Sequence, residues 1–302
     1  MPTIGVDVGG TKCLGVLWSS DGVGAESRRP TPHGNDPHDL ITTIVGVIRD
    51  LEEVAASEPL SVGIGMPGLV TRSGVVRASP NLTDVSDLAV RDEVGSVLGR
   101  PVLVDNDATC AAVAEWRAGA GRGVTDMVMI TLGTGIGAGI VANGAVLRGA
   151  HGFAGEIGHM VIDPDGPWCP CGQRGCWERF ASGSALQARA DDVLGPCPTG
   201  RWQGQDVAAL ASEGNGPARE IFTEFAQWVA RGIVNVTNIL DPALVVLGGG
   251  VVRTAPLFLD DVRRHVAQLL YAPNQRDLPA ITVAHWDERA GAVGAALLAG
   301  ME

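Results

Sequence analysis

Basic residues are scarce in this sequence. It contains 22 Lys and Arg against 34 Asp and Glu, which gives a net charge of −12 at pH 7. Proteins that bind the phosphate backbone of nucleic acids rely on clustered Lys and Arg. The charge balance therefore argues against a nucleic-acid partner, although an acidic protein can still bind a nucleotide through its backbone amides.

Long apolar runs are also missing. Charged residues or glycines interrupt every hydrophobic stretch before it reaches the roughly 18 residues that indicate a transmembrane helix. The first residues, MPTIGVDVGG, contain no basic leader followed by an apolar core, so they do not look like a secretory signal. We expect a cytoplasmic protein without a membrane partner.

Cysteines are few, and half of them are clustered. Only six occur in 302 residues, yet Cys169, Cys171 and Cys176 share the stretch CPCGQRGCW. In a reducing compartment, clustered cysteines are more often metal ligands than disulfide partners. With His159 they form a Cys₃His set that suits a closed, tetrahedral, structural Zn²⁺ site with no open position for substrate. Reduced thiols beside a solvated histidine are the alternative.

The distribution of apolar residues predicts a two-lobed α/β protein. The chain is long enough for two domains of about 150 residues each. Two strand–turn–strand patterns correspond to each other, with DVGGTK at 7–12 matching TLGTGI at 131–136. Apolar residues at helical spacing occupy 37–56 and 217–240. The self-similarity at the start of each half is expected of a duplicated fold.

The Gly-rich stretch AGAGRG at 118–123 is the expected boundary between the lobes. We assign residues 1–117, together with the small-residue helix at 290–302, to a small N-terminal lobe. Residues 118–289 form the expected large lobe, which contains the second glycine loop, the cysteines and a third loop, LGGGV.

The glycine loops suggest that phosphate groups approach the backbone closely. Glycine permits positive φ and leaves room for amide donors to face an anion, whereas tight hairpins without a ligand are the alternative. Neither of the first two loops contains GxxxxGK[ST], so a P-loop enzyme is excluded. The run GTGIGA at 133–138 matches the dinucleotide pattern GxGxxG/A. A strand is expected after it, however, where that fingerprint requires a helix.

The three loops resemble those of a known enzyme family. DVGGTK at 7–12, LGTGIGAGIV at 132–141 and VVLGGGV at 245–251 look like the two phosphate loops and the adenosine loop of sugar kinases in the actin and hexokinase superfamily. Within it the chain resembles the ROK family (repressors, open reading frames, kinases), and more narrowly its actinobacterial glucokinases. The resemblance runs from about residue 3 to the last helix and includes the Cys₃His signature with its trailing Glu.

The resemblance implies an actin- and hexokinase-like, RNase H-like fold in which ATP lies between two lobes. It implies that Asp7 positions Mg²⁺ through water. The residues that it assigns to ATP are Gly9, Gly10, Thr11, Lys12, Gly133, Thr134 and Gly135 at the phosphates, and Gly249 and Gly250 at the nucleoside. Relatives are often dimers or tetramers, so a homo-oligomer is expected.

The acids beside the cysteine signature are implied to bind the sugar. Glu156 precedes His159, and Glu178 follows Cys176; in the family the corresponding acids and the histidine hold sugar hydroxyls. Zn²⁺ on one imidazole nitrogen would fix the tautomer and leave the other nitrogen as a hydrogen-bond donor. The family pattern also assigns residues Gly68, Asn81, Asn106 and Asp107 to the sugar.

The run PVLVDNDAT places Asn106 and Asp107 at the end of a buried strand, a usual position for functional groups in an α/β lobe. Taken alone, Asp107 could simply cap the helix that follows. The resemblance makes Asp107 the catalytic base that takes the proton from the attacking hydroxyl. Strand alternation should point Asp105 the other way.

Together these features predict an ATP-dependent kinase that phosphorylates the primary 6-hydroxyl of glucose or a close analogue. Thr109 stands where glucokinases of the family usually have a second Asn, and NLTDVSDL from Asn81 lacks the Trp commonly found there. An aminohexose (kanosamine, N-acetylglucosamine or N-acetylmannosamine) or a cyclitol is therefore an alternative substrate, and polyphosphate is an alternative donor.

Two other function classes are weighed against the kinase. A sugar-responsive ROK repressor is disfavoured because the first loop strand begins by residue 3, with no basic helix-turn-helix before it. A zinc-containing NAD dehydrogenase is the other hypothesis, and it would show a nicotinamide absorbance change with sugars.

Overall fold

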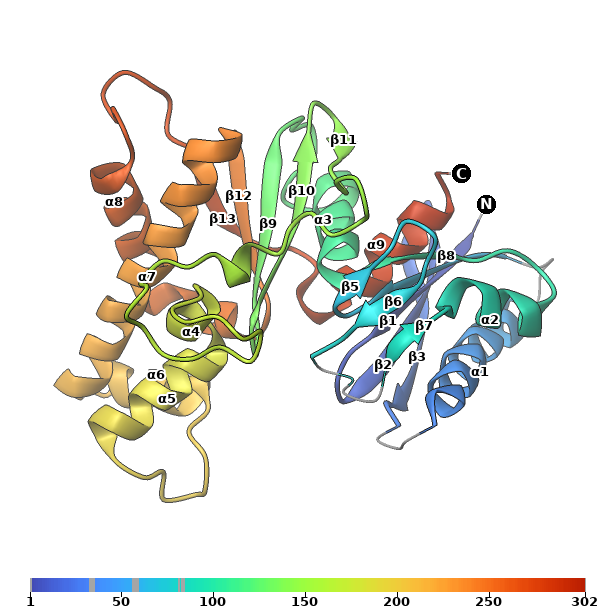
Figure 1. The fold of residues 1–302 in the computed structure, drawn as a ribbon, viewed down its shortest axis with the longest axis horizontal. Coiled ribbons are helices and arrows are strands. Elements are labelled where there is room, and N and C mark those ends of the chain that lie inside the picture. The colour runs from blue at the N-terminus through green and yellow to red at the C-terminus, as the bar shows by residue number, and fades with distance from the viewer. Residues whose placement is uncertain (1, 33–35, 56–59, 81, 83–84, 302) are drawn as a thin grey trace. The chain divides into compact units, whose positions relative to one another are not determined.

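The computed structural model describes residues 2–32, 36–55, 60–80, 82 and 85–301. They divide into two compact units (Figure 1). Unit 1 contains Met1–Thr125, Gly139–Gly155 and His285–Glu302, and unit 2 contains Asp126–Ala138 and Glu156–Ala284. Residues 139–155, which the sequence places in the second lobe, group with unit 1.

Unit 1 is built on a five-stranded sheet with the order β3-β2-β1-β4-β8. The hairpin predicted at the N-terminus is the antiparallel pair β1 and β2, and β4 and β8 join β1 in parallel. The strands are β1 (Thr3–Val8), β2 (Lys12–Ser19), β3 (Gly22–Pro30), β4 (Ser61–Met66) and β8 (Leu103–Asn106). A smaller sheet contains β5 (Leu69–Val70), β6 (Val76–Ala78) and β7 (Ser86–Leu88).

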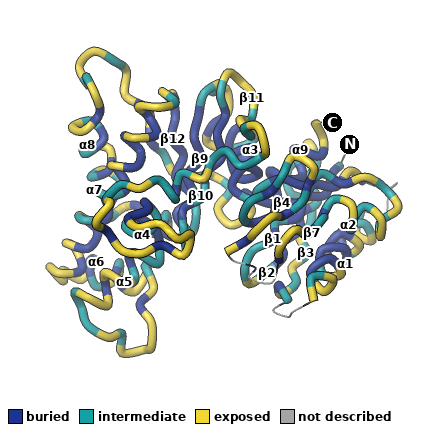
Figure 2. Tube along the Cα trace, viewed as in Figure 1, coloured by how far each residue is buried: buried dark blue, intermediate teal, exposed yellow. Residues whose placement is uncertain are grey.

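A second five-stranded sheet has the order β11-β10-β9-β12-β13, which matches the order in unit 1. The antiparallel pair of β10 and β11 lies at one edge, and β12 and β13 follow β9 in parallel. This agreement confirms the duplication expected from the two matching loops. The strands are β9 (Met127–Leu132), β10 (Ile136–Ala142), β11 (Ala145–Val146), β12 (Leu244–Gly248) and β13 (Ala280–Val283). Figure 2 shows β9 and β12 almost entirely buried, as their continuous apolar sequences predict.

The two stretches predicted from helical spacing correspond to α1 and α7. The helices of unit 1 are α1 (Pro37–Ala55), α2 (Val90–Leu98), α3 (Asp107–Ala118), η3 (Asp287–Arg289) and α9 (Ala290–Ala299). Those of unit 2 are η1 (Ile157–His159), α4 (Glu178–Ala181), α5 (Gly183–Leu194), α6 (Gly204–Ser212), α7 (Gly216–Leu240), η2 (Gly250–Leu257) and α8 (Leu259–Leu269). Within the described ranges, no helix is both long and apolar enough to cross a membrane.

Helix α9 packs very closely in unit 1, against β1, β4 and α3. It consists almost entirely of Ala, Gly, Val and Leu. A Cβ atom at Gly5 of β1 would lie 1.9 Å from the carbonyl oxygen of Ala292, and a Cβ at Gly294 would lie 1.6 Å from that of Cys110 in α3. Glycine at these positions allows the backbones to approach, so the buried strand β1 is covered on one face by α9.

We expect Gly294→Ala to lower the free energy of unfolding by about 3 kcal/mol or more, because the new methyl group collides with backbone that cannot rotate away. Gly300→Ala at the end of the same helix is the control, since its Cβ would meet Thr3 Cγ2 at an ordinary 3.4 Å. Urea denaturation of both variants measures the difference. Equal midpoints would show that α3 and α9 do not depend on this contact.

Candidate active site

The first predicted phosphate loop is the turn between β1 and β2 in unit 1. The N–H of Gly9 donates to the carbonyl of Lys12 at 2.9 Å, and the hydroxyl of Thr31 donates to the carbonyl of Gly9 at 2.7 Å. Asp7 lies near the end of β1 against α9, where a Cβ at Gly291 would come within 2.4 Å of its Oδ1. The hairpin and α9 together hold the loop and the acid in place.

Asp7 and Asp107 form an acidic pair beside Gly65 of β4. A Cβ atom at Gly65 would lie 3.5 Å from both Oδ1 of Asp7 and Cα of Asp107. Desolvation, with repulsion from Asp107, raises the pKa of Asp7 to about 7, and Lys12 opposes the rise. Adjacent carboxylates are the ligands that a hard cation prefers. The donors present therefore fit the Mg²⁺ that the sequence implies.

Asn106, rather than Asp107, caps helix α3. Its Oδ1 accepts from the N–H of Thr109 at 3.0 Å, and its Nδ2 donates to the carbonyl of Gly68 at 3.1 Å. Asp107 is the first helical residue, and its Oδ1 accepts from the N–H of Ala108 at 2.8 Å. The structure thus places Gly68, Asn106 and Asp107 together, and the capping role considered for Asp107 falls to its neighbour.

Asp105 has a different environment. Its side chain is largely buried, and its Oδ2 accepts a hydrogen bond from Nε of Arg148 at 2.7 Å. Its Oδ1 accepts from the N–H of Asn106 at 2.9 Å. The carboxylate is therefore an ion-pair partner within unit 1. The sequence contained no signal for Arg148, because the pair joins residues 43 positions apart.

The second predicted phosphate loop is the turn between β9 and β10, in unit 2. The N–H of Gly133 donates to the carbonyl of Gly135 at 3.0 Å, and the carbonyl of Gly133 accepts from Gly183 at 2.7 Å. Gly249, which follows β12 with φ of +83°, lies against Leu132, so the predicted adenosine loop adjoins this turn. Strand β10 follows the loop where a dinucleotide fingerprint requires a helix, which removes that alternative.

The three cysteines and His159 come together in unit 2. Their ligand atoms all lie within 4.8 Å of one another. The sulfur atoms of Cys171 and Cys176 are 3.5 Å apart, and Cys169 Sγ is 3.7 Å from Nδ1 of His159. Neighbouring ligands of a tetrahedral Zn²⁺ ion with Zn–S distances of about 2.3 Å are separated by roughly 3.8 Å. The spacing and the donor chemistry both fit Zn²⁺.

Two acids flank this cluster, one on each side of the imidazole. Oε1 of Glu178 accepts from the thiol of Cys169 at 3.1 Å and lies 3.8 Å from Nδ1 of His159. Oε2 of Glu156 lies 4.0 Å from Nε2 of the same ring. Burial raises the pKa of Glu156, while His159 opposes the rise and Glu178 adds to it. The ring thus directs Nδ1 toward the cysteines and Nε2 toward Glu156.

Trp177 anchors the cluster to helix α7. Its side chain is fully buried, and its Nε1 donates to the carbonyl of Trp228 at 2.8 Å. A Cβ atom at Gly232 would lie 1.9 Å from the indole ring, so only glycine leaves room for it. Because Trp177 stands between Cys176 and Glu178, its packing determines where both side chains are directed.

The predicted residues are therefore gathered into groups within each unit. Unit 1 contains Asp7, Gly9, Gly10, Thr11, Lys12, Gly68, Asn106 and Asp107. Unit 2 contains Gly133, Thr134, Gly135, Glu156, His159, Cys169, Cys171, Cys176, Glu178, Gly249 and Gly250. Asn81 lies outside the described residues.

Comparison with known proteins identifies the family. The ROK family profile matches residues 3–302. A glucokinase of Streptomyces coelicolor is 34% identical over 98% of this chain and 97% of its own length. An N-acetylmannosamine kinase of Citrobacter koseri is 36% identical over 99% of both chains. The crystal structure of a ROK family glucokinase from Streptomyces griseus, in complex with glucose and AMPPNP, covers all of both chains with a TM-score of 0.87 and 34% identity.

The fold, the glycine loops and the Cys₃His group thus occur in a chain that matches one family from residue 3 to residue 302. This chain belongs to the ROK family.

Proposed function

We propose that this chain is an ATP-dependent kinase that transfers the γ-phosphoryl group to the primary hydroxyl of glucose or a close analogue. The observation that carries the proposal is the acidic pair of Asp7 and Asp107, which adjoins the first phosphate loop in unit 1. The similarity to glucokinases over nearly the whole chain supports it.

In the proposed reaction Asp107 is the general base. It takes the proton from the sugar hydroxyl as that oxygen bonds to the γ-phosphorus and the bond to ADP breaks. Asp7 would hold Mg²⁺, which neutralises charge on the phosphates when bound. Thr11, Lys12, Gly133 and Thr134 would contact the phosphates, because exposed loop amides and an ammonium group suit them.

The Cys₃His group would hold a structural Zn²⁺. Ligation through Nδ1 of His159, the nitrogen that faces the cysteines, would leave Nε2 protonated. That N–H, with the carboxylates of Glu156 and Glu178, would bind sugar hydroxyls. Gly68 and Asn106 would complete the sugar contacts, since the amide Nδ2 of Asn106 carries a second hydrogen beyond the one donated to Gly68.

An aminohexose is the second candidate substrate. The N-acetylmannosamine kinase of Citrobacter koseri is as similar to this chain as the glucokinases are, and Thr109 replaces the expected Asn two residues after the proposed base. A coupled ADP-release assay across hexoses, aminohexoses and cyclitols with ATP as donor, together with direct detection of the sugar phosphate when polyphosphate replaces ATP, tests both candidates. Absence of turnover with every sugar would reject the kinase assignment.

We expect Asp107→Asn to lower kcat by about 10²- to 10⁴-fold with little change in the sugar KM, because the amide cannot accept the proton. Asp105→Asn is the matched control. It breaks the pair with Arg148 and should lower the free energy of unfolding by about 1–3 kcal/mol, with a much smaller effect on kcat. Near wild-type turnover of Asp107→Asn would show that another group is the base.

Cys171→Ser should lose Zn²⁺ and raise the sugar KM more than the ATP KM, since the ion orients only sugar-binding side chains in this proposal. Cys197→Ser is the control, because Cys197 lies outside the four-residue group. Metal analysis by mass spectrometry, together with both KM values, checks the result. A zinc-free wild-type protein would contradict the assignment.

Glu178→Gln should retain Zn²⁺ but raise the sugar KM by roughly tenfold to a hundredfold, because the amide keeps only one acceptor oxygen for the hydroxyls. The ATP KM should change by less than about twofold. Steady-state kinetics in each substrate measures the two effects. Equal weakening for both substrates would mean that Glu178 supports the fold instead.

A further inference from the structure

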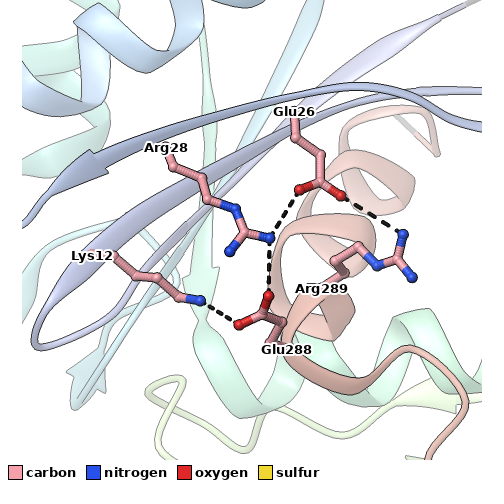
Figure 3. A network of polar contacts seen from close by, with 5 residues as sticks. All are labelled: Lys12, Glu26, Arg28, Glu288 and Arg289. Atoms are coloured by element: carbon pink, nitrogen blue, oxygen red, sulfur yellow. Dashed lines mark hydrogen bonds and ion pairs between the residues drawn. The ribbon is translucent and has the colours of Figure 1, made fainter.

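A network of charged side chains surrounds the ammonium group of Lys12 in unit 1 (Figure 3). We call the five residues Lys12, Glu26, Arg28, Glu288 and Arg289 the Lys12 network. Glu288 is at its centre: its Oε2 lies 2.5 Å from Nζ of Lys12, and its Oε1 accepts from Arg28 at 2.9 Å. Glu26 pairs with Arg28 at 3.0 Å and with Arg289 at 3.7 Å, but it does not contact Lys12.

Lys12 needs such a partner if its position is to be defined. The lysine side chain is a flexible four-carbon stem that ends in a point charge. It is the first residue of β2, directly after the phosphate loop, and 38% of its side chain is exposed. Glu288 uses one of the three ammonium hydrogens and leaves two for phosphate oxygens.

Glu288 is itself held from two sides. Lys12 and Arg28 keep its carboxylate ionised and lower its pKa to about 2. The backbone just before it is tied to helix α3, because Oε1 of the fully buried Glu115 accepts from the N–H groups of His285 at 2.9 Å and Trp286 at 2.8 Å. The segment that carries Glu288 is therefore hydrogen-bonded to α3, the helix that begins at Asp107.

The Lys12 network has a net positive charge that can attract an anionic ligand. The three basic and two acidic side chains of the Lys12 network leave one net positive charge, in a chain whose total is −12. An acid that only neutralised Lys12 would work against phosphate binding. Here Arg28 and Arg289 offset the two acids, so Glu288 can orient the ammonium without removing the attraction for an anion.

We propose that Glu288 is a positioning residue that holds Lys12 in the orientation in which its ammonium receives the nucleotide phosphates. The inference rests on the proposed function, because it takes Lys12 to be a phosphate ligand. Glu288 touches neither substrate in this proposal and acts only through Lys12.

The test is the binding of AMPPNP with Mg²⁺, measured by titration calorimetry in the absence of sugar, together with both KM values. Glu288→Gln should weaken AMPPNP binding and raise the ATP KM by about threefold to tenfold, with the sugar KM unchanged. Glu26→Gln is the matched control from the same network and should change AMPPNP binding by less than about twofold. In a Lys12→Ala background, Glu288→Gln should have no further effect.

Four results would overturn the proposal. Tighter AMPPNP binding by Glu288→Gln would mean that Glu288 competes with the phosphates for Lys12. Unchanged binding would mean that Glu288 does not position Lys12. Equal weakening by Glu26→Gln would assign the effect to the network as a whole. An additive loss in the Lys12→Ala background would show that Glu288 does not act through Lys12. A wild-type protein that binds AMPPNP but phosphorylates no sugar would reject the kinase assignment and leave this binding test intact.

Discussion

The close approach of helix α9 to its neighbours is the constraint on which unit 1 depends. Glycines on both sides of the contact allow it: Gly63 of β4, like Gly5 of β1, could not accept a Cβ without a collision with the α9 backbone. The helix thereby reaches Asp7 through Gly291 and lies along α3, which begins at Asp107. Asp7 and Asp107 come from distant parts of the chain. They become neighbours because residues with small side chains let the backbones of β1, α3 and α9 approach closely.

A second constraint is the buried carboxylate of Glu115. It accepts three backbone hydrogen bonds, two from His285 and Trp286 and one from Ala120 at 2.9 Å. A buried carboxylate is costly unless such donors satisfy it. These bonds fix the segment in which the chain re-enters unit 1, and so they determine where Glu288 meets Lys12. The same helix therefore begins at the proposed base and, near its other end, holds the backbone that precedes Glu288.

In unit 2 a single aromatic residue, Trp177, positions the neighbouring functional side chains. Trp177 fills the space left by Gly232 on α7, and the residues on either side of it belong to the cysteine group and to the proposed sugar site. Most of the short loop that carries the cysteines is exposed, including residues 167–168 and 170–174. Its geometry then depends on the indole and, in the proposed function, on Zn²⁺, which is a usual arrangement for a small loop that cannot form a core.

The sequence by itself determined the features that local pattern encodes: the hairpins with their glycine loops, the amphipathic helices, the duplicated order of elements and the spacing of the Cys₃His group. Tertiary structure alone decided that Asn106 donates to the carbonyl of Gly68, that Arg148 binds Asp105, and that residues 139–155 group with unit 1. It also decided that Glu288 meets Lys12, 276 positions away. Periodicity and turn chemistry act over a few residues, whereas these contacts arise only when packed backbones bring distant residues into one place.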